Sequence, residues 1–279
     1  IPYFSEGLTE TYDVLIVFDA PVIRKETLKD IDLHIQSGKG AILMLDPFQR
    51  MNSANAALSI KPSKDGQINS IDDLLKSYGL DFSNSKIVGD FKSAATVESA
   101  TGRNFSYPYW LQIKDNNISK KHIVSDNLKE LLFAEAGFFE TNKNDIDVQP
   151  IILTSAETNF LSKKELREKS TETLATEFQT TSEVRKIIAL HLSGQVDSPY
   201  GQTKNETNKP TSSIFAIADV DWLYNGFSLA DARMGDRAFS RPINDNHKLF
   251  LNMVEHIAGD PNLMNIRSRE SPIRIYEKN

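Results

Sequence analysis

The stretch that most constrains the fold is an apolar run from Ile214 to Ala218, which ends abruptly at two carboxylates, Asp219 and Asp221. A continuous apolar run of this length, bounded by polar residues, is typical of a strand buried on both faces. Such strands occur in parallel sheets covered by helices, and those sheets bind ligands beyond the carboxyl ends of their strands. The run therefore predicts a fold class and the sheet edge where a site would lie.

A second part of the chain, near its N-terminus, carries the pattern of a βαβ unit. The apolar residues 14–18 and 41–45 predict two buried strands. Between them, Leu28, Ile31 and Ile35 recur at the spacing of an amphipathic helix. Strand, helix and strand in so short a stretch predict a parallel pair joined by a right-handed crossover.

Other segments extend this pattern. Residues 70–78 predict a short helix capped by Ser70, and residues 245–258 predict the clearest amphipathic helix of the chain. Further strands are predicted at 86–90, 150–155 and 186–192. Together these segments predict an α/β fold built on a mostly parallel sheet with helices on both faces.

The middle of the chain is less regular. The segment 107–113 predicts an extended edge strand, because Pro108 cannot donate a hydrogen bond within a central ladder. Residues 128–139 are compatible with a strand or a helix, and residues 161–181 with a surface helix or a loop. The predicted organisation is an α/β sheet domain at 1–91 and 185–266, a more β-rich insertion or subdomain at 92–184, and a C-terminal tail at 267–279.

The composition excludes several classes of protein. The 279 residues include no cysteine, which excludes disulfides, thiolate zinc sites and cysteine nucleophiles. A net charge of −6 argues against a general nucleic-acid-binding protein, which would present a basic face. No window approaches the ~18 consecutive apolar residues of a membrane helix, and the first residues do not resemble a signal peptide. We therefore expect a soluble segment, which is compatible with a piece of a longer protein.

Acidic residues follow four of the predicted strands. If these strands are parallel, their carboxylates converge on one edge of the sheet, where they can hold a hard cation such as Mg²⁺ or Ca²⁺. Aspartate is also common after strands because it makes turns and caps helices. This structural interpretation is favoured over the metal site. The residues concerned are Asp19, Asp46, Asp90, Asp219 and Asp221.

Few motifs for catalysis accompany these acids. Arg233, Arg237 and Arg241 follow Asp221 along the chain, and an arginine paired with Asp219 is favoured over a phosphate site. The five histidines show no zinc-binding spacing, and the sequence has neither a Gly-x-Ser-x-Gly elbow nor a phosphate-binding glycine loop. We therefore expect no metal and no cofactor.

Two aromatic clusters indicate a different kind of site, because aromatic faces can stack on a sugar ring. Aromatic side chains beside strands more often pack in the core, since each buries a large apolar area. The packing interpretation is favoured here. The clusters are Tyr107, Tyr109 and Trp110, and Trp222, Tyr224 and Phe227.

A set of short motifs, spread over nearly the whole chain, is similar to those of a known family. The chain resembles the extracytoplasmic domain of the auxiliary component of uncharacterised ABC transport systems, a group that includes the gliding-motility-associated transporter proteins. One departure is the pair Ser37-Gly38, which stands where a double glycine is usual. The matching stretches are Tyr12–Pro21, Ile31–Pro47, Leu74–Leu80, Tyr107–Pro108, Ile152–Ser155, Ala189–Gly194, Ala218–Leu223, Phe250–Asp260 and Ile266–Arg269.

This resemblance implies a flavodoxin-like fold, similar to class I glutamine amidotransferase domains but without their catalytic residues. It also implies a periplasmic or otherwise extracytoplasmic location, with the full-length protein anchored to the inner membrane by segments outside this chain. The implied partners are the permease and ATPase subunits of the transporter. The family has no established catalytic residues to carry over, so Asp219, Asp221 and Asn252 are matched only as motif positions.

The leading hypothesis is a non-catalytic accessory or binding domain of a bacterial ABC transport system. One alternative is a metal-dependent hydrolase or transferase that uses the acidic strand ends, with Asp219 and Asp221 as ligands. Another is a glycan-binding module that uses Trp110 or Trp222. The candidate ligand- or partner-binding residues are Asp219, Asp221, Asp19, Asp46, Asn252 and Arg237.

Overall fold

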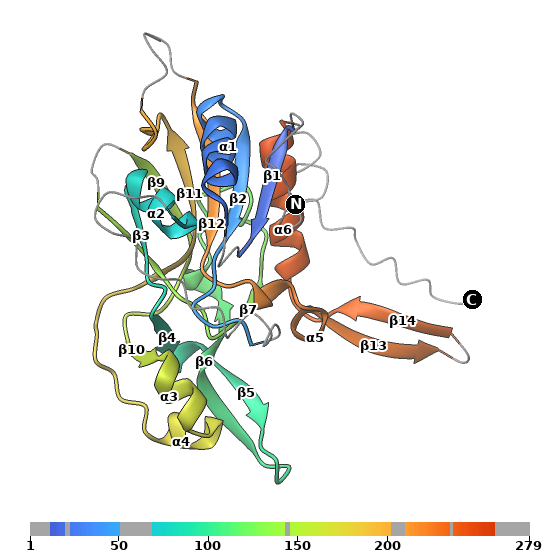
Figure 1. Cartoon of the computed structure of the whole chain (residues 1–279). Coiled ribbons are helices and arrows are strands. Elements are labelled where there is room, and N and C mark those ends of the chain that lie inside the picture. The colour runs from blue at the N-terminus through green and yellow to red at the C-terminus, as the bar shows by residue number, and fades with distance from the viewer. Residues whose placement is uncertain are drawn as a thin grey trace, which may run out of the picture.

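A mixed seven-stranded sheet lies at the centre of the computed structural model (Figure 1). The structure describes residues 12–19, 23–50, 69–142, 146–201, 210–234 and 237–259, apart from the side chains of 232–239. The strand order is β1-β2-β12-β11-β8-β3, and β9 also pairs with β11. The bounds are β1 Val14–Phe18, β2 Gly40–Met44, β3 Leu80–Phe82, β8 Phe139–Thr141, β9 Asp147–Leu153, β11 Ile187–Gly194 and β12 Ser212–Ile217.

The parallel βαβ unit predicted near the N-terminus is confirmed. β1 pairs in parallel with β2, with Val14 opposite Gly40. Helix α1, Lys25–Gln36, connects the two strands and buries Leu28 and Ile35 completely. On its other side, β2 pairs in parallel with β12. The carboxyl ends of β1, β2 and β12 therefore lie at one edge of the sheet.

The expectation of a mostly parallel sheet, flavodoxin-like or similar to glutamine amidotransferase domains, is wrong. β11 is antiparallel to both β12 and β9, and β8 is antiparallel to both β11 and β3. A parallel pair needs a long crossover connection, usually a helix, and the described residues between β11 and β12 contain no helix. An apolar run such as 214–218 reports only that the strand is buried on both faces, which also holds for a central strand of a mixed sheet.

The two faces of the sheet are covered differently. On one face lie α1 and α2, Ile71–Ser77, whose Leu74 shares a core with Leu43 of β2. The other face packs against α6, Asn246–Ala258, and against a second layer of strands. Phe215 of β12 is in the same core as Phe133 from this layer. The expectation of a sheet covered by helices on both faces is therefore wrong, because on the second face β structure lies beside α6 and forms much of the cover.

The second layer contains a three-stranded antiparallel sheet and a separate strand pair. The three strands, in the order β5-β6-β7, are Ala94–Glu98, Asn104–Lys114 and Glu130–Ala134. The pair consists of β4, Lys86–Asp90, and β10, Thr158–Ser162. Residues 86–90 thus form a strand as predicted, but this strand lies outside the main sheet.

Strand β6 corrects the prediction of an edge strand at 107–113, because it is the middle strand of its sheet. The register between β6 and β5 shifts within the ladder: Ala94 lies opposite Leu111, but the next residue, Ala95, lies opposite Tyr107. The pairing of β6 with β7 starts only at Trp110. Pro108 therefore lies in an irregular segment between the two ladders, where its missing N–H costs no ladder hydrogen bond.

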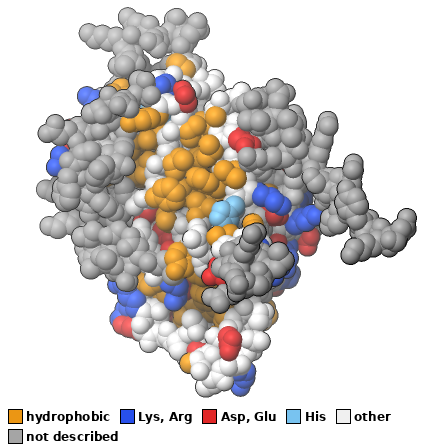
Figure 2. Space-filling view, turned by 90° about the vertical axis from the view of Figure 1, so that its right-hand side faces the viewer, with side chains coloured by type: hydrophobic (Ala, Val, Ile, Leu, Met, Phe, Trp, Pro, Cys, Tyr) orange, Lys and Arg blue, Asp and Glu red, His pale blue; other side chains and the backbone are white. Residues whose placement is uncertain are grey.

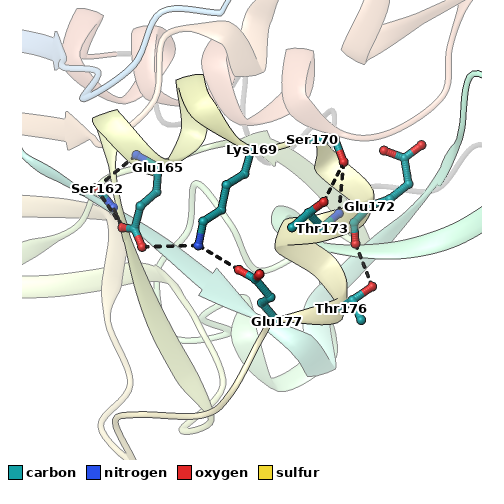
Figure 3. Close-up of polar contacts among 8 residues, drawn as sticks. All are labelled: Ser162, Glu165, Lys169, Ser170, Glu172, Thr173, Thr176 and Glu177. Atoms are coloured by element: carbon teal, nitrogen blue, oxygen red, sulfur yellow. Dashed lines mark hydrogen bonds and ion pairs between the residues drawn. The ribbon is translucent and has the colours of Figure 1, made fainter.

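The segment predicted as a surface helix or a loop holds two short helices, α3 Lys163–Glu168 and α4 Thr171–Thr176. Ser162 and Glu165 form a capping box at the start of α3, shown in Figure 3. Lys169 follows α3 and contacts Glu165 at 3.9 Å on one side and Glu177 at 2.7 Å on the other. At the start of α4, the hydroxyl oxygen of Ser170 accepts a hydrogen bond from the backbone N–H of Thr173. The two caps explain why two helices of less than two turns each are formed.

The remaining elements are short. Single 3₁₀ turns lie at 91–93, 115–117 and 221–223, and α5 spans Asn225–Ser228. Strands β13, Leu229–Met234, and β14, Arg237–Pro242, form a hairpin that projects from the body of the molecule (Figure 1). Among the described residues, no helix is long and apolar enough to cross a membrane. β8 and β9 come from 92–184 and pair within the main sheet; the predicted domain boundaries stay a prediction.

Candidate functional site

Three of the strand-end acids meet at the edge of the sheet where β2 and β12 end. Asp46 follows β2, and Asp219 and Asp221 follow β12; each offers a carboxylate oxygen within 4.8 Å of the other two. All three side chains are buried, and Asp219 is fully enclosed. The parallel pairing of β2 with β12 explains the meeting, because both strands finish at the same level. We call these three residues the acidic trio.

Backbone N–H groups from several loops hold the acidic trio. Asp46 accepts hydrogen bonds from the backbone N–H of Phe48 at 2.7 Å and of Val220 at 3.1 Å. Asp219 accepts from the N–H of Ala134 at 2.7 Å, which ties β7 to the end of β12. The backbone N–H of Trp222 also donates to Asp219, at 3.2 Å. The backbone N–H of Arg50 donates to Asp221 at 2.7 Å. These carboxylates therefore fasten the loops of the sheet edge to one another.

The electrostatics of the acidic trio favour the uptake of a positive charge. Burial raises the pKa of Asp46 and of Asp219 well above the ordinary aspartate value. The charges of the neighbouring carboxylates raise the pKa of both groups further. Carboxylates this close in a poorly solvated site do not all ionise at once. The trio therefore favours a shared proton or a bound cation over three full negative charges.

Asp19 and Asp90 lie outside the trio. Asp19 follows β1 and accepts a hydrogen bond from the side-chain amide of Gln49. Burial raises the pKa of Asp19 to about 7. Asp90 ends β4 in the second layer, where Ser155 donates to it through its backbone N–H at 2.6 Å and its hydroxyl at 2.7 Å. Asp90 is therefore a structural group that joins β4 to the loop before β10.

The remaining candidate residues are also separate from the trio. Asn252, on α6, donates through its amide to the carbonyl of Val124 at 2.9 Å. It thereby fixes the helix to the loop that precedes β7. Arg237 is the first residue of β14, and its side chain lies outside the described part of the structure. The predicted pairing of an arginine with Asp219 stays a prediction for Arg237.

A buried ion pair beside the trio is absent from the sequence-based candidates. The guanidinium of Arg50 forms two hydrogen bonds with the fully buried carboxylate of Glu135, one of them 2.6 Å long. The hydroxyl of Tyr107 donates to the same carboxylate at 3.2 Å. The signal in the sequence is a lone glutamate within the apolar stretch 131–139. A charge in such a stretch needs a partner, but the sequence does not reveal which one.

Three histidines that the sequence spaces far apart are also brought together. His122 lies before β7, His191 in β11 and His256 in α6, and their ring nitrogens lie within 4.8 Å of one another. Burial lowers the pKa of His122 to about 4 and that of His191 to about 3. Burial also lowers the pKa of His256. All three rings are therefore neutral at pH 7.

The two tryptophans differ in exposure. Trp222 is fully buried and stacks on Phe133, with 5.7 Å between the ring centroids. It has no free face for a sugar. Trp110 is partly exposed and packs edge-on against Phe227 at 4.9 Å. Only Trp110 therefore keeps the glycan-binding alternative open.

Fold and site together define a mixed α/β domain with a buried, backbone-bound acidic edge. Its sequence places it more closely: the chain belongs to the family described as ABC-type uncharacterized transport system, whose model matches residues 1–253. The resemblance noted in the sequence is thus confirmed, and the chain is an auxiliary component of such a transport system. No curated protein matches the chain significantly.

One similar solved structure is described as the "mmIFT52 N-terminal domain". Its TM-score is 0.48 at 10% sequence identity, over 89% of this chain and 78% of that chain.

Proposed function

We propose that the chain is a non-catalytic extracytoplasmic domain of a bacterial ABC transport system, working with the permease and ATPase subunits. The family match over 1–253 is the observation that carries this proposal. In this role the domain binds a partner or a ligand outside the membrane, while the full-length protein is anchored to the inner membrane by other segments.

The acidic trio supports a binding role over a catalytic one. Asp46 and Asp219 each accept two backbone hydrogen bonds. Carboxylates bound in this way stabilise loop structure and have fewer lone pairs left for a substrate. The trio therefore organises the sheet edge at which a ligand or partner can dock.

An apolar surface over β1 and α6 is the best candidate for the contact with the permease. Figure 2 shows hydrophobic side chains gathered on this side of the molecule. Phe18 of β1 is 52% exposed and Leu251 of α6 is 43% exposed, and the half-buried Ile16 and Val254 belong to the same two elements. In addition, β1 is an edge strand of the main sheet. Exposed apolar patches beside an edge strand are typical of protein interaction sites.

Site-specific cross-linking in cells tests this proposal. A photoreactive amino acid at Leu251 of the full-length protein should yield an adduct with the permease. The same amino acid at Val184, which is 61% exposed but lies outside β1 and α6, serves as the matched control. No transporter subunit in an adduct from either position would refute the accessory role. Equal adducts from both positions would refute the assignment of the surface.

The second candidate function is a metal-dependent hydrolase or transferase, which the meeting of Asp46, Asp219 and Asp221 favours. Oxygen ligands suit Mg²⁺, Mn²⁺ and Ca²⁺. Calorimetric titration with each ion distinguishes the two functions. Binding that disappears in Asp221→Asn supports the metal site, whereas no heat at millimolar metal excludes it.

A further inference from the structure

We propose that His122, His191 and His256 form a binding site for one divalent transition-metal ion, with Zn²⁺ as the reference ion. The site lies on the face of the main sheet that α6 covers, beside Phe215, with its ligands on a loop, on β11 and on α6. It is separate from the acidic trio and independent of the proposed transport role. Imidazole nitrogen is a preferred ligand of Zn²⁺, Cu²⁺, Ni²⁺ and Co²⁺.

The distances between the ring nitrogens are close to those of a metal site. Nε2 of His122 and Nδ1 of His191 are 3.0 Å apart. Two nitrogens bound to one tetrahedral Zn²⁺ at about 2.0–2.1 Å are about 3.3–3.4 Å apart. The pair therefore needs to separate by only a few tenths of an ångström. His256 completes the set within 4.8 Å, and rotation of its half-buried side chain can shorten that distance.

Packing holds the three rings in place. The ring centroids of His122, His191 and His256 are 5.0 to 5.4 Å apart. Phe215 contacts all three rings and stacks on His191 at 4.4 Å. The site is thus preformed on one side by the core. His256 is only partly buried, so an ion can enter from its side and keep a water molecule as a fourth ligand, as in open His₃ zinc sites.

The hydrogen bonds around His191 prepare it as a ligand. Its Nε2 is 2.9 Å from the hydroxyl oxygen of Ser213. When Nε2–H donates to that oxygen, Nδ1 is left with a free lone pair that points towards His122. Ligating histidines usually donate their second N–H to such an outer partner, which fixes the tautomer and the orientation of the ring. Ser213 is therefore a positioning residue for the metal.

Metal binding changes which ring nitrogen of His122 carries the proton. The backbone N–H of Val124 donates to Nδ1 of His122 at 3.3 Å, so the single proton of the neutral ring is on Nε2 in the metal-free state. That Nε2–H donates to Nδ1 of His191. When Nε2 binds the metal, this proton moves to Nδ1 of the same ring and the long contact with Val124 is lost. No proton is released, because the ring is neutral before and after binding.

Titration of the chelator-treated chain with Zn²⁺ by calorimetry, and with Co²⁺ by visible absorption, tests the proposal. We expect one equivalent of Zn²⁺ to bind in the micromolar range or tighter. His256→Gln should weaken binding at least about 100-fold, and Ser213→Ala about 10-fold. Mg²⁺ should produce no effect that depends on the histidines, because it prefers oxygen ligands.

Two control variants separate this site from other sources of binding. His247 also lies on α6 but is not part of the cluster, so His247→Gln should bind Zn²⁺ as the unmodified chain does. Asp221→Asn should also leave Zn²⁺ binding unchanged, because it alters only the acidic trio. Failure to bind at about 100 μM Zn²⁺, or equal affinity of His256→Gln, would overturn the proposal.

A measurement on the unmodified chain covers the case in which His256→Gln does not fold. NMR of the imidazole nitrogens reports which ring nitrogen carries the proton. On addition of Zn²⁺, the proton of His122 should move from Nε2 to Nδ1, while that of His191 stays on Nε2. An unchanged tautomer of His122 at saturating Zn²⁺ would overturn the proposal.

Discussion

Loss of the Arg50 guanidinium should destabilise the domain strongly, because it leaves the buried carboxylate of Glu135 without its cation. The side chain of Glu135 is fully buried, and that of Arg50 is 33% exposed. Removing one partner of a buried ion pair costs about 3–5 kcal/mol. Water can reach the position of Arg50 in part, so we expect Arg50→Met to lower the free energy of unfolding by about 2–4 kcal/mol.

Urea denaturation of the purified chain measures this effect, and a double variant shows its origin. Glu135→Gln removes the buried charge, so Arg50→Met/Glu135→Gln should be about 1–2 kcal/mol more stable than Arg50→Met alone. Lys164→Met is the matched control, because it breaks an exposed pair with Glu168 and should change stability by about 0.5 kcal/mol or less. The reasoning is refuted if Arg50→Met costs no more than this control, or if Glu135→Gln makes the double variant less stable still.

Three further predictions concern packing and pH. Asn246→Ala should lower the free energy of unfolding by about 2–4 kcal/mol in chemical denaturation, because the buried amide of Asn246 forms hydrogen bonds with the backbone of Leu132 and Trp222. The control Asn252→Ala loses one hydrogen bond on the same helix and should cost about 0.5–1.5 kcal/mol. Equal losses for the two variants would contradict this prediction. Gly40→Ala should lower the melting temperature, because a Cβ there would lie 2.1 Å from Ile257, and an unchanged value would disprove the close contact. The pKa of Asp19 is raised to about 7, so the folded chain keeps a proton on this carboxyl that the unfolded chain releases near pH 4. The contribution of Asp19 to stability is therefore full below pH 4 and is lost as pH rises to about 7. Denaturation of Asp19→Asn between pH 4 and 7 should show a smaller loss of stability with rising pH than the unmodified chain, although Asp72 and Lys163 also act on this carboxyl; parallel curves would exclude the effect.

Local patterns in the sequence were sufficient for the parallel pair of β1 and β2. The apolar runs of β1, β2 and β12, and the helical spacing of Leu28, Ile31 and Ile35, predicted the segments and the pairing of β1 with β2. For the carboxylates at the ends of β2 and β12, the sequence predicted a meeting only if the strands were parallel, and the parallel pairing of these two strands fulfils that condition. The segments and the β1–β2 pairing depend only on neighbours along the chain and on strand geometry, whereas β2 and β12 are distant in the sequence and become neighbours only through the fold.

The direction of the other strands could not be inferred in the same way. An apolar run reports burial but carries no information about whether its neighbour runs parallel or antiparallel. β11 therefore matched the predicted pattern of a buried strand although it is antiparallel to β12. β4 was likewise correct as a strand and yet pairs with β10 in a different layer.

The sequence by itself determined the buried segments, the acidic ends of the strands, the lack of cysteine chemistry and the family. Only the tertiary structure decided which polar groups meet across long stretches of chain. Packing of separate layers brings Glu135 into an ion pair with Arg50 and places His122 beside His191 and His256. The physical reason is that a buried charge or ring needs a partner in space, and the fold, not the spacing of residues along the chain, supplies it.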